Sequence, residues 1–322
     1  MNAKRIGIVG ARGHVGRELL KLLENDPTCT VAFVASKGAA RQRASEAIGA
    51  VGRFADLVLE DVQPADLVAG AKYGDLDGVV LGLSNGQSAP WVQAVPAHIP
   101  LVDLSADHRF VDDGPFVYGL TERDRERVRS AKRIANPGCY ATAVQLAVVP
   151  FLDVATRVHV FGISGYSGAG STPSPKNDLQ ILADNVLPYD LAGHTQEREL
   201  ARHSGVVDMR FMPHVAPFFR GISCTIHIDL SSALDVDTAL SRLRARFATE
   251  PLVTVVDGDM PPLVSDVRDR NGVVIGGVEV DVVNKRLVLV SVIDNLLKGA
   301  ATQALQNLHL MLGVDELSGI TP

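Results

Sequence analysis

The chain has 322 residues, of which 46% are hydrophobic and 21% are charged, a balance typical of a globular protein large enough for two domains. Its net charge of −6 argues against nucleic acid as a partner, since nucleic-acid-binding proteins carry a basic face. The sequence has no apolar run long enough to span a membrane, and its start lacks the pattern of a signal peptide. We therefore expect a cytoplasmic protein that binds neither nucleic acid nor membranes.

The first third of the chain alternates short apolar segments with helical or loop segments. Strands are expected at Arg5–Val9, Thr30–Ala35, Gly78–Leu83 and Leu101–Leu104. A helix at His14–Glu24 separates the first two strands, and the alternating charges of Arg123–Arg133 are typical of a solvated helix. Strands that alternate with helices in this way form parallel, doubly wound sheets. This part of the chain therefore predicts a Rossmann-type α/β domain.

The rest of the chain indicates a second, different domain. Longer strands are expected at Val158–Gly162, Ile222–Leu230, Gly272–Val283 and Arg286–Ile293. The last two would form a β-hairpin across the two-residue turn Asn284-Lys285. Helices are expected at Tyr140–Leu152 and Leu297–Leu312, the second of them capped by Gly313. We predict an α/β fold in which residues 1–139 and 295–322 form the dinucleotide-binding domain and residues 140–294 form an α+β domain with a mixed sheet.

Three glycines follow the first expected strand and open the first expected helix. Gly10, Gly13 and Gly16 have the spacing G-x-x-G-x-x-G, which lets the backbone approach a pyrophosphate at the helix N-terminus. A tight turn that binds nothing would have the same spacing. The residues of this loop that we expect to bind a dinucleotide are Gly10, Arg12, Gly13, His14, Val15 and Gly16.

The end of the second expected strand indicates which dinucleotide binds. NAD-binding domains carry an Asp or Glu about 20 residues after the glycines, where it bonds the ribose 2′-hydroxyl. This chain instead has Ser36-Lys37, followed by Arg41 and Arg43, and no carboxylate before Glu46. A hydroxyl followed by cations suits a 2′-phosphate, so Ser36 and Lys37 favour NADP(H). An ordinary basic surface loop is the alternative interpretation.

Cys139 is the candidate reactive thiol among three cysteines that lie far apart in the sequence. It follows the turn Asn136–Gly138 and precedes an expected helix, whose positive end lowers the pKa of a thiol. Cys29 and Cys224 lie inside expected strands, where a buried structural cysteine is common. No spacing of histidines or cysteines is typical of a metal site, so no metal is predicted.

Five segments of the chain resemble the N-acetyl-gamma-glutamyl-phosphate reductase family, which belongs to the wider semialdehyde dehydrogenase group. In the order of that family they are Asp103–Arg109, Asn136–Ala143, Ser164–Gly170, Pro213–Gly221 and Asn295–Ala301. The resemblance implies an oxidoreductase of arginine biosynthesis in which the Cys139 thiolate attacks an acyl phosphate. Hydride from NADPH would then reduce the thioacyl enzyme to an aldehyde. It also implies that residues 140–294 carry catalysis and dimerisation, in a homodimer or homotetramer.

The family takes its acid/base histidine from a Gly-His-Arg-His-x-x-Glu-like segment. Aligned without a gap, His194 matches the first histidine as the general acid/base and Glu199 matches the glutamate as its orienting group. The pair Thr195-Gln196 replaces the Arg and the second His of the family. An alternative register places His194 on the second histidine and Glu197 on the glutamate, but it needs a deletion. His214 is the competing base.

The resemblance implies further roles. Arg109 would bind the phosphoryl group bidentately, with helix capping or an ion pair to Asp107 as the alternative. The residues expected near the cofactor in addition to the glycine loop are Ser84, Ser167, Gly168 and Asn295. The candidates for binding the substrate carboxylate are Arg198, Arg202, Arg210 and Arg220.

The chain also departs from the family, with Ser84-Asn85 in place of Pro-His and Ala141 in place of a proline. These departures fit a divergent branch or a different acyl substrate. Other acyl-phosphate reductases remain alternatives: one of lysine biosynthesis, one acting on another N-acyl glutamyl phosphate, or aspartate-semialdehyde dehydrogenase. The last is disfavoured because its active-site glutamine is Ser164 here. A non-catalytic NADP sensor would have no use for an activated Cys139 beside a base.

Overall fold

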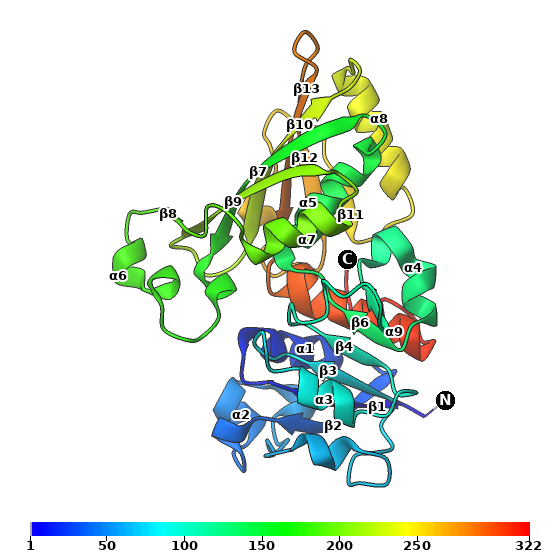
Figure 1. The fold of residues 1–322 in the computed structure, drawn as a ribbon. Coiled ribbons are helices and arrows are strands. Elements are labelled where there is room, and N and C mark those ends of the chain that lie inside the picture. The colour runs from blue at the N-terminus through cyan, green and yellow to red at the C-terminus, as the bar shows by residue number, and fades with distance from the viewer. Residues whose placement is uncertain (1) are drawn as a thin grey trace. The chain divides into compact units, whose positions relative to one another are not determined.

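The computed structural model describes residues 2–322 and divides the chain into two compact units (Figure 1). The first unit comprises the chain up to Pro137 together with Ala300–Thr321, and the second comprises Gly138–Gly299 and Pro322. The second unit thus begins at Gly138 rather than at residue 140 and ends at Gly299 rather than at residue 294. Within the described residues, no helix combines the length and the apolar character that crossing a membrane requires.

The first unit contains a six-stranded parallel sheet in the order β2-β1-β3-β4-β6-β5. Its strands are β1 (Lys4–Val9), β2 (Cys29–Ala35), β3 (Gly78–Leu81), β4 (Leu101–Asp103), β5 (Phe116–Tyr118) and β6 (Arg133–Ala135). Ile6, Ile8 and Leu81 are fully buried, as expected for strands that are covered on both faces. The strand order reverses between β1 and β3, the kind of position at which doubly wound sheets bind ligands. The predicted Rossmann-type domain is confirmed.

The helices of the first unit are α1 (His14–Glu24), α2 (Ala44–Ile48), α3 (Ala89–Ala94), α4 (Thr121–Ser130) and α9 (Thr302–Leu312). Shorter 3₁₀ turns lie at Lys37–Ala39, Gly52–Phe54 and Pro64–Leu67. The predicted final helix is not uniform, because a π-helical turn at Leu297–Ala301 precedes α9. Gly313 caps α9 with a φ of 67°, which confirms the predicted C-cap. The chain end thereby joins the first unit.

The second unit contains a seven-stranded sheet in the order β11-β12-β13-β10-β7-β9-β8. Its strands are β7 (Ala155–Gly165), β8 (Leu187–Pro188), β9 (Asp208–Ala216), β10 (Ile222–Leu230), β11 (Val253–Val255), β12 (Val273–Asp281) and β13 (Arg286–Ile293). The pairs β7–β9 and β11–β12 are parallel and the others antiparallel, which confirms the predicted mixed sheet. The predicted two-residue hairpin turn is wrong. The β12–β13 ladder closes at Asp281 and Arg286, so the loop has four residues, Val282–Lys285.

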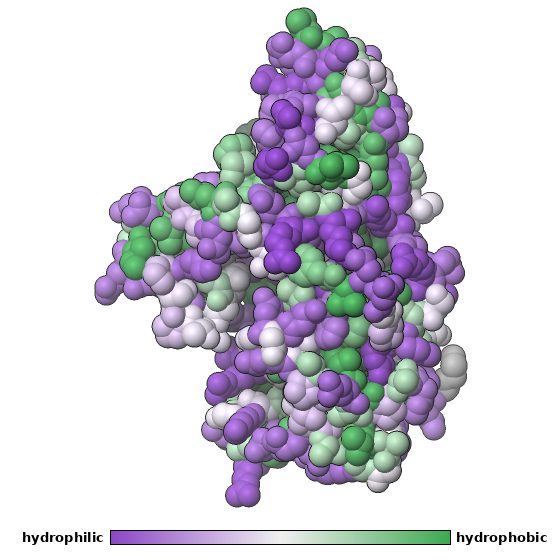
Figure 2. Space-filling view, viewed as in Figure 1, coloured by the Kyte–Doolittle hydropathy of each residue, from purple (hydrophilic) through white to green (hydrophobic). Residues whose placement is uncertain are grey.

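The helices of the second unit are α5 (Cys139–Val148), α6 (Leu179–Leu182), α7 (Thr195–His203) and α8 (Val236–Phe247). Its 3₁₀ turns lie at Val149–Phe151, Tyr166–Ala169, Pro175–Asn177 and Val264–Asp266. Residues 140–148 of α5 are all buried, because the helix packs against β10 and β13 on one side and α7 on the other. Residues 170–194, which include α6 and β8, extend away from the rest of this sheet (Figure 1). Within this 170–194 segment, α6 exposes the apolar side chains of Leu179 and Ile181. Figure 2 shows hydrophobic side chains (green) on the surface of the protruding part.

Candidate active site

The glycine loop between β1 and α1 has the close backbone contacts that only glycine permits. Gly10 has a φ of 83°, and a Cβ atom placed there would lie 2.3 Å from the carbonyl oxygen of Gly82. A Cβ atom on Gly16 would lie 2.3 Å from Cα of Ala11. Gly13 is the N-cap of α1, and neither a capping side chain nor an acidic residue occupies its first turn. The positive end of α1 is therefore suited to an anion such as a pyrophosphate.

The turn after β2 brings together three of the residues expected to contact the nucleotide. Ser36 follows the strand and is half-buried, Lys37 is exposed, and the guanidinium group of Arg12 lies against Gly38. A Cβ atom on Gly38 would lie 2.4 Å from Nη1 of Arg12. The neighbouring carboxylate of Glu60 is already engaged, since it accepts hydrogen bonds from Lys72 and Tyr73 at 2.6 and 2.7 Å. The turn thus presents cations and a hydroxyl group, which suits a phosphate.

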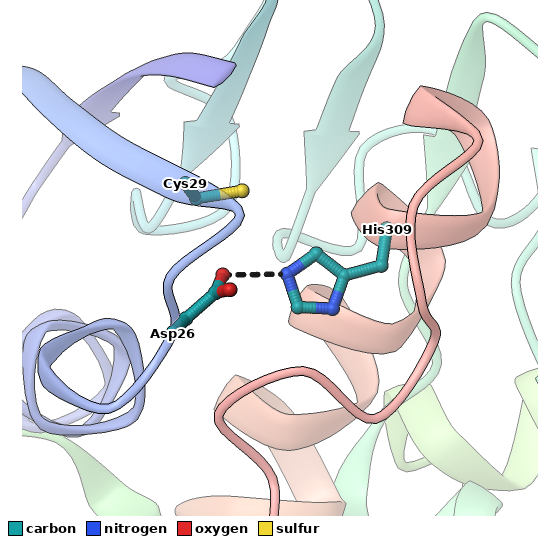
Figure 3. A group of neighbouring side chains, drawn as sticks. All are labelled: Asp26, Cys29 and His309. Atoms are coloured by element: carbon teal, nitrogen blue, oxygen red, sulfur yellow. Dashed lines mark hydrogen bonds and ion pairs between the residues drawn. The ribbon is translucent and has the colours of Figure 1, made fainter. Parts of the chain in front are cut away.

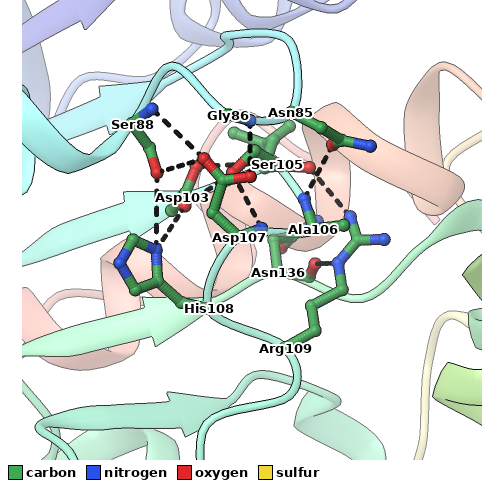
Figure 4. A network of polar contacts seen from close by, with 11 residues as sticks. Asn85, Gly86, Ser88, Asp103, Ser105, Ala106, Asp107, His108, Arg109 and Asn136 are labelled. Atoms are coloured by element: carbon green, nitrogen blue, oxygen red, sulfur yellow. Dashed lines mark hydrogen bonds and ion pairs between the residues drawn. The ribbon is translucent and has the colours of Figure 1, made fainter.

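The loops that follow β3 and β4 are tied together by a polar network (Figure 4). Asp107 accepts hydrogen bonds from the backbone of Gly86 at 2.6 Å and from Oγ of Ser88 at 2.8 Å. The backbone of Ala106 donates to Oδ1 of Asn85 at 2.9 Å. Ser84 is exposed in the same loop. Asn85, a departure from the family pattern, therefore has a structural role in this chain.

Arg109 follows this network in the chain and contacts the turn that precedes Cys139. Its Nε donates to the carbonyl oxygen of Asn136 and its Nη2 to that of Leu104, both at 2.8 Å (Figure 4). The residue is only 8% exposed, so these bonds fix the plane of the guanidinium group. The orientation of the Arg109 guanidinium group is therefore set by the backbone on both sides of it.

Cys139 is the first residue of α5 and lines a cavity of about 110 Å³ in the second unit. The side chain is half-buried, whereas Cys29 and Cys224 are fully buried. Glu199, which is fully buried, accepts a hydrogen bond at 2.8 Å from the backbone nitrogen of Gly138, the N-cap of α5. The carboxylate of Glu199 therefore holds the start of the helix on which the thiol sits.

His194 lines the same cavity and is the N-cap of α7. Its Nδ1 accepts a hydrogen bond from the backbone nitrogen of Gln196 at 3.1 Å, so the neutral ring carries its proton on Nε2. Burial lowers the pKa of His194 below 6.5, more than the nearby Asp190 raises it. His214 lies on β9, where its Nδ1 is 3.2 Å from the carbonyl oxygen of Met212. The neighbouring Val215, not His214, lines the cavity, so the geometry favours His194 over its competitor.

The glycine-rich loop after β7 is also part of this cavity. Gly168 lines it directly. Asn295 donates from Nδ2 to Oγ of Ser167 at 3.0 Å and accepts from the backbone of Gly221 at 2.7 Å. Ser167 and Asn295 are both buried, so the structure brings these two predicted residues together and ties the loop to the start of β10.

Two family models together match most of the chain. Residues 5–131 match the semialdehyde dehydrogenase NAD binding domain, and residues 139–295 match the semialdehyde dehydrogenase dimerisation domain. An N-acetyl-gamma-glutamyl-phosphate reductase from Xanthomonas oryzae pv. oryzae is 49% identical over 98% of both chains. One from Stenotrophomonas maltophilia is 47% identical over 98% of this chain and 97% of its own. The chain belongs to the semialdehyde dehydrogenase family.

Solved structures of the semialdehyde dehydrogenase family have the same fold. Aspartate semialdehyde dehydrogenase II from Vibrio cholerae, complexed with ASA, matches with a TM-score of 0.76 at 19% identity, over 97% of this chain and 99% of its own. The enzyme from Candida albicans, solved with NADP, has a TM-score of 0.74 at 17% identity, over 97% and 99% of the chains. The expected oxidoreductase of the N-acetyl-gamma-glutamyl-phosphate reductase group is thus confirmed, with a domain for a nicotinamide dinucleotide and a second for oligomerisation.

Two departures from the family pattern lie beside Cys139. The backbone nitrogen of Ala141, which replaces the proline of the family pattern, donates to Oε1 of Gln196 at 3.0 Å. Nε2 of Gln196 then lies 3.8 Å from Sγ of Cys139. A proline at 141 has no N–H to hold this side chain, so the two replacements form a pair. The sequence showed Gln196 only as a departure and gave no signal that it contacts Sγ of Cys139.

The structure assigns other partners to two of the four arginines that were candidates for binding the substrate carboxylate. Arg220 is buried and bonded to Asp294 at 3.0 Å, and Arg210 pairs with Asp208 at 2.9 Å. Arg198 and Arg202 are exposed on α7. The cation that lines the cavity is instead Lys176, which sequence reasoning missed. The only feature of the sequence that could have indicated Lys176 is that it follows the Ser164–Gly170 segment.

One group of described residues in the first unit has the composition of a metal site. Asp26, Cys29 and His309 are buried and place potential ligand atoms within 4.8 Å of one another (Figure 3). The carboxylate is already engaged, because it accepts from both the backbone and Oγ1 of Thr28 and lies 3.0 Å from Nε2 of His309. Burial raises the pKa of the Cys29 thiol to about 12, which disfavours the metal-binding thiolate. We interpret the group as a hydrogen-bonded cluster, and the absence of a metal stays a prediction.

Proposed function

We propose that the chain catalyses the NADPH-dependent reduction of N-acetyl-gamma-glutamyl phosphate to N-acetylglutamate semialdehyde and phosphate, a step of arginine biosynthesis. The proposal rests on one observation: Cys139 and His194 line the same cavity in a chain that is 49% identical to N-acetyl-gamma-glutamyl-phosphate reductases. A nucleophilic thiol beside a proton donor is what acyl transfer from an acyl phosphate requires.

Cys139 is the nucleophile in this proposal. Its sulfur, as the thiolate at the N-terminus of α5, forms a bond to the acyl carbon while the bond from that carbon to the phosphate oxygen breaks. NADPH, when bound, supplies the hydride that reduces the resulting thioester. The hemithioacetal then releases the aldehyde and returns the thiolate. The net reaction takes up one proton, which ends on the released hydrogen phosphate.

His194 is the proton donor and acceptor at the carbonyl oxygen. With Nδ1 held by the backbone of Gln196, its Nε2–H can donate to the oxyanion that forms at each addition step. Glu199 accepts a hydrogen bond from the backbone of Gly138, so its proposed role includes positioning the start of α5.

The first unit would hold the cofactor and Arg109 would hold the phosphoryl group. The pyrophosphate would bind at residues 10–16, and the 2′-phosphate beside Arg12, Ser36 and Lys37, which is why we infer NADP(H) rather than NAD(H). Ser84, Ser167, Gly168 and Asn295 are proposed to contact the nicotinamide half. The hydrogen bonds to Asn136 and Leu104 would orient the Arg109 guanidinium group for this contact.

We further infer a homodimer or homotetramer formed through the second unit, since this unit matches a dimerisation domain. The cytoplasm is the inferred location. No role for a metal is proposed.

The decisive experiment runs the reaction backwards, with N-acetylglutamate semialdehyde, phosphate and NADP. We expect NADPH to form only when phosphate is present, and a lack of this dependence would rule out the proposed reaction. Cys139→Ser should abolish turnover while NADP binding stays near normal. Replacing NADP by NAD in the same assay tests the roles of Ser36 and Lys37, and equal kcat/KM values would contradict them.

A further inference from the structure

The cavity that contains Cys139 has one charged side chain of permanent sign, and it is a cation. The described residues that line it are Cys139, Tyr140, Ser164, Gly165, Gly168, Ala169, Lys176, Tyr189, His194, Gln196 and Val215. None of them is a carboxylate, and burial favours the neutral form of His194. An anionic substrate that enters this cavity therefore meets Lys176 as its counter-charge.

The backbone around Lys176 is fixed by its own hydrogen bonds. Lys176 lies in the 3₁₀ turn Pro175–Asn177, which Ser174 and Asn177 close as a capping box. Nδ2 of Asn177 also donates to the carbonyl oxygens of Gly170 and Thr172, at 3.0 and 2.8 Å. These bonds connect the turn to the glycine-rich loop after β7, so Lys176 has a defined position relative to the cavity wall.

The ammonium group itself is only weakly engaged. Nζ of Lys176 lies 4.7 Å from the centre of the Tyr189 ring and 3.8 Å from Oδ2 of Asp190, whose side chain is 59% exposed. A long ion pair with an exposed carboxylate contributes little and is easily exchanged for another anion. The ring of Tyr189 orients the ammonium group without neutralising it.

We propose that Lys176 binds the free carboxylate of the substrate and selects substrates that carry it. The inference rests on the proposed function, which supplies a substrate with an acyl phosphate at one end and a carboxylate at the other. The phosphoryl group has a proposed partner in Arg109, whereas none of the four arginines considered for the carboxylate lines the cavity. Lys176 thereby fixes which end of the substrate faces away from Cys139.

The test compares two aldehydes in the phosphate-dependent reverse reaction. One is N-acetylglutamate semialdehyde, and the other is 4-acetamidobutanal, which has the same aldehyde and acetamide groups but no carboxylate. Lys176→Met should raise KM for the first aldehyde on the order of 10- to 100-fold, the value of one charge-assisted hydrogen bond. It should leave KM for 4-acetamidobutanal and for phosphate unchanged. Lys176→Arg should keep most of the preference for the carboxylate.

Lys285→Met is the matched control, because Lys285 is exposed in the loop between β12 and β13. It should behave as the wild-type enzyme with both aldehydes. Lys176→Gln is a second variant without the charge and should show the same rise in KM for N-acetylglutamate semialdehyde. An unchanged affinity for NADP shows that the variants are folded, so that the rise in KM reflects lost recognition of the carboxylate. If the wild-type enzyme has no phosphate-dependent activity, the proposed function is wrong. If the wild-type enzyme is active and the variants keep its preference, or lose phosphate affinity instead, the assignment of Lys176 is overturned.

Discussion

Asp26→Ala should destabilise the first unit strongly, because it removes the acceptor at the centre of a fully buried cluster. Asp26 and His309 both have no exposed surface, and they connect the loop after α1 to α9 near the chain end (Figure 3). Oδ1 of Asp26 also accepts from the hydroxyl groups of Thr28 and Ser318. Nδ1 of His309 lies 3.2 Å from the carbonyl oxygen of Glu316, so both ring nitrogens face acceptors.

The magnitude follows from what each variant leaves unpaired. Alanine leaves the N–H of His309 and the hydroxyl groups of Thr28 and Ser318 buried without their acceptor and opens a space, which together cost about 3–5 kcal/mol. Asparagine keeps the shape and an acceptor for Thr28, but its amide loses the charge-assisted bond to His309. Asp26→Asn should therefore cost about 1.5–3 kcal/mol.

The contribution of Asp26 depends on pH in a defined direction. Burial raises the pKa of this carboxyl group, but the hydrogen bonds from His309, Ser318 and Thr28 outweigh burial and hold it well below its usual value of 3.8. The unfolded chain therefore takes up the proton first as the pH falls. The stabilisation is complete above 3.8 and is lost as the pH falls towards the pKa of the folded state. The difference in the free energy of unfolding between the wild type and Asp26→Asn should therefore shrink as the pH falls below 3.8.

Urea unfolding followed by tryptophan fluorescence measures the free energy of unfolding of the first unit, which contains Asp26. The chain has one tryptophan, Trp91, which packs against the core of the first unit. Asp56→Ala is the matched control, since Asp56 is 86% exposed in its pair with Arg43 and should contribute less than about 1 kcal/mol. If Asp26→Ala costs no more than this control at pH 7, the cluster does not stabilise the fold as argued.

Three further predictions concern the active site and the glycine loop. Gln196→Ala should slow alkylation of Cys139 and lower kcat up to about 10-fold, because it removes a hydrogen bond to the sulfur. Ala141→Pro removes the N–H that holds Gln196, so it should slow alkylation and lower kcat in the same way. The double variant should then be no slower than either single variant. If the losses of kcat add up in the double variant, the two residues are not coupled as argued. Burial holds the pKa of His194 below 6.5, so kcat/KM should be constant just above pH 6.5 and should fall as the pH is lowered below this value. A fall in kcat/KM that is centred above pH 6.5 would refute the assignment of His194 as the acid/base. Gly16→Ala places a methyl group 2.3 Å from Cα of Ala11, so it should destabilise the first unit by about 1–3 kcal/mol and weaken NADP binding. Gly258→Ala is the control, because no atom lies within 4 Å of the added methyl group, and it should change neither stability nor NADP binding.

Local sequence patterns predicted the elements whose structure depends on neighbouring residues. The bounds of α1, β10 and β13 agree with the prediction, since a strand or helix with a buried face carries its own period. The position of Cys139 at a helix start also follows from the turn that precedes it. The hairpin loop was mispredicted because its length depends on where the ladder between two strands ends, and only the pairing of Asp281 with Arg286 fixes that.

The sequence by itself therefore determined the Rossmann-type domain, the glycine loop and the position of Cys139 at a helix start. Only the tertiary structure decided which side chains surround the sulfur. Gln196 and Lys176 reach the cavity from segments that are remote from Cys139 in the chain, and neither has a local pattern that distinguishes it from a surface residue. The same holds for Asp26 and His309, which the chain separates by 283 positions. Polar contacts of this kind depend on how elements pack, and a one-dimensional pattern carries no information about that packing.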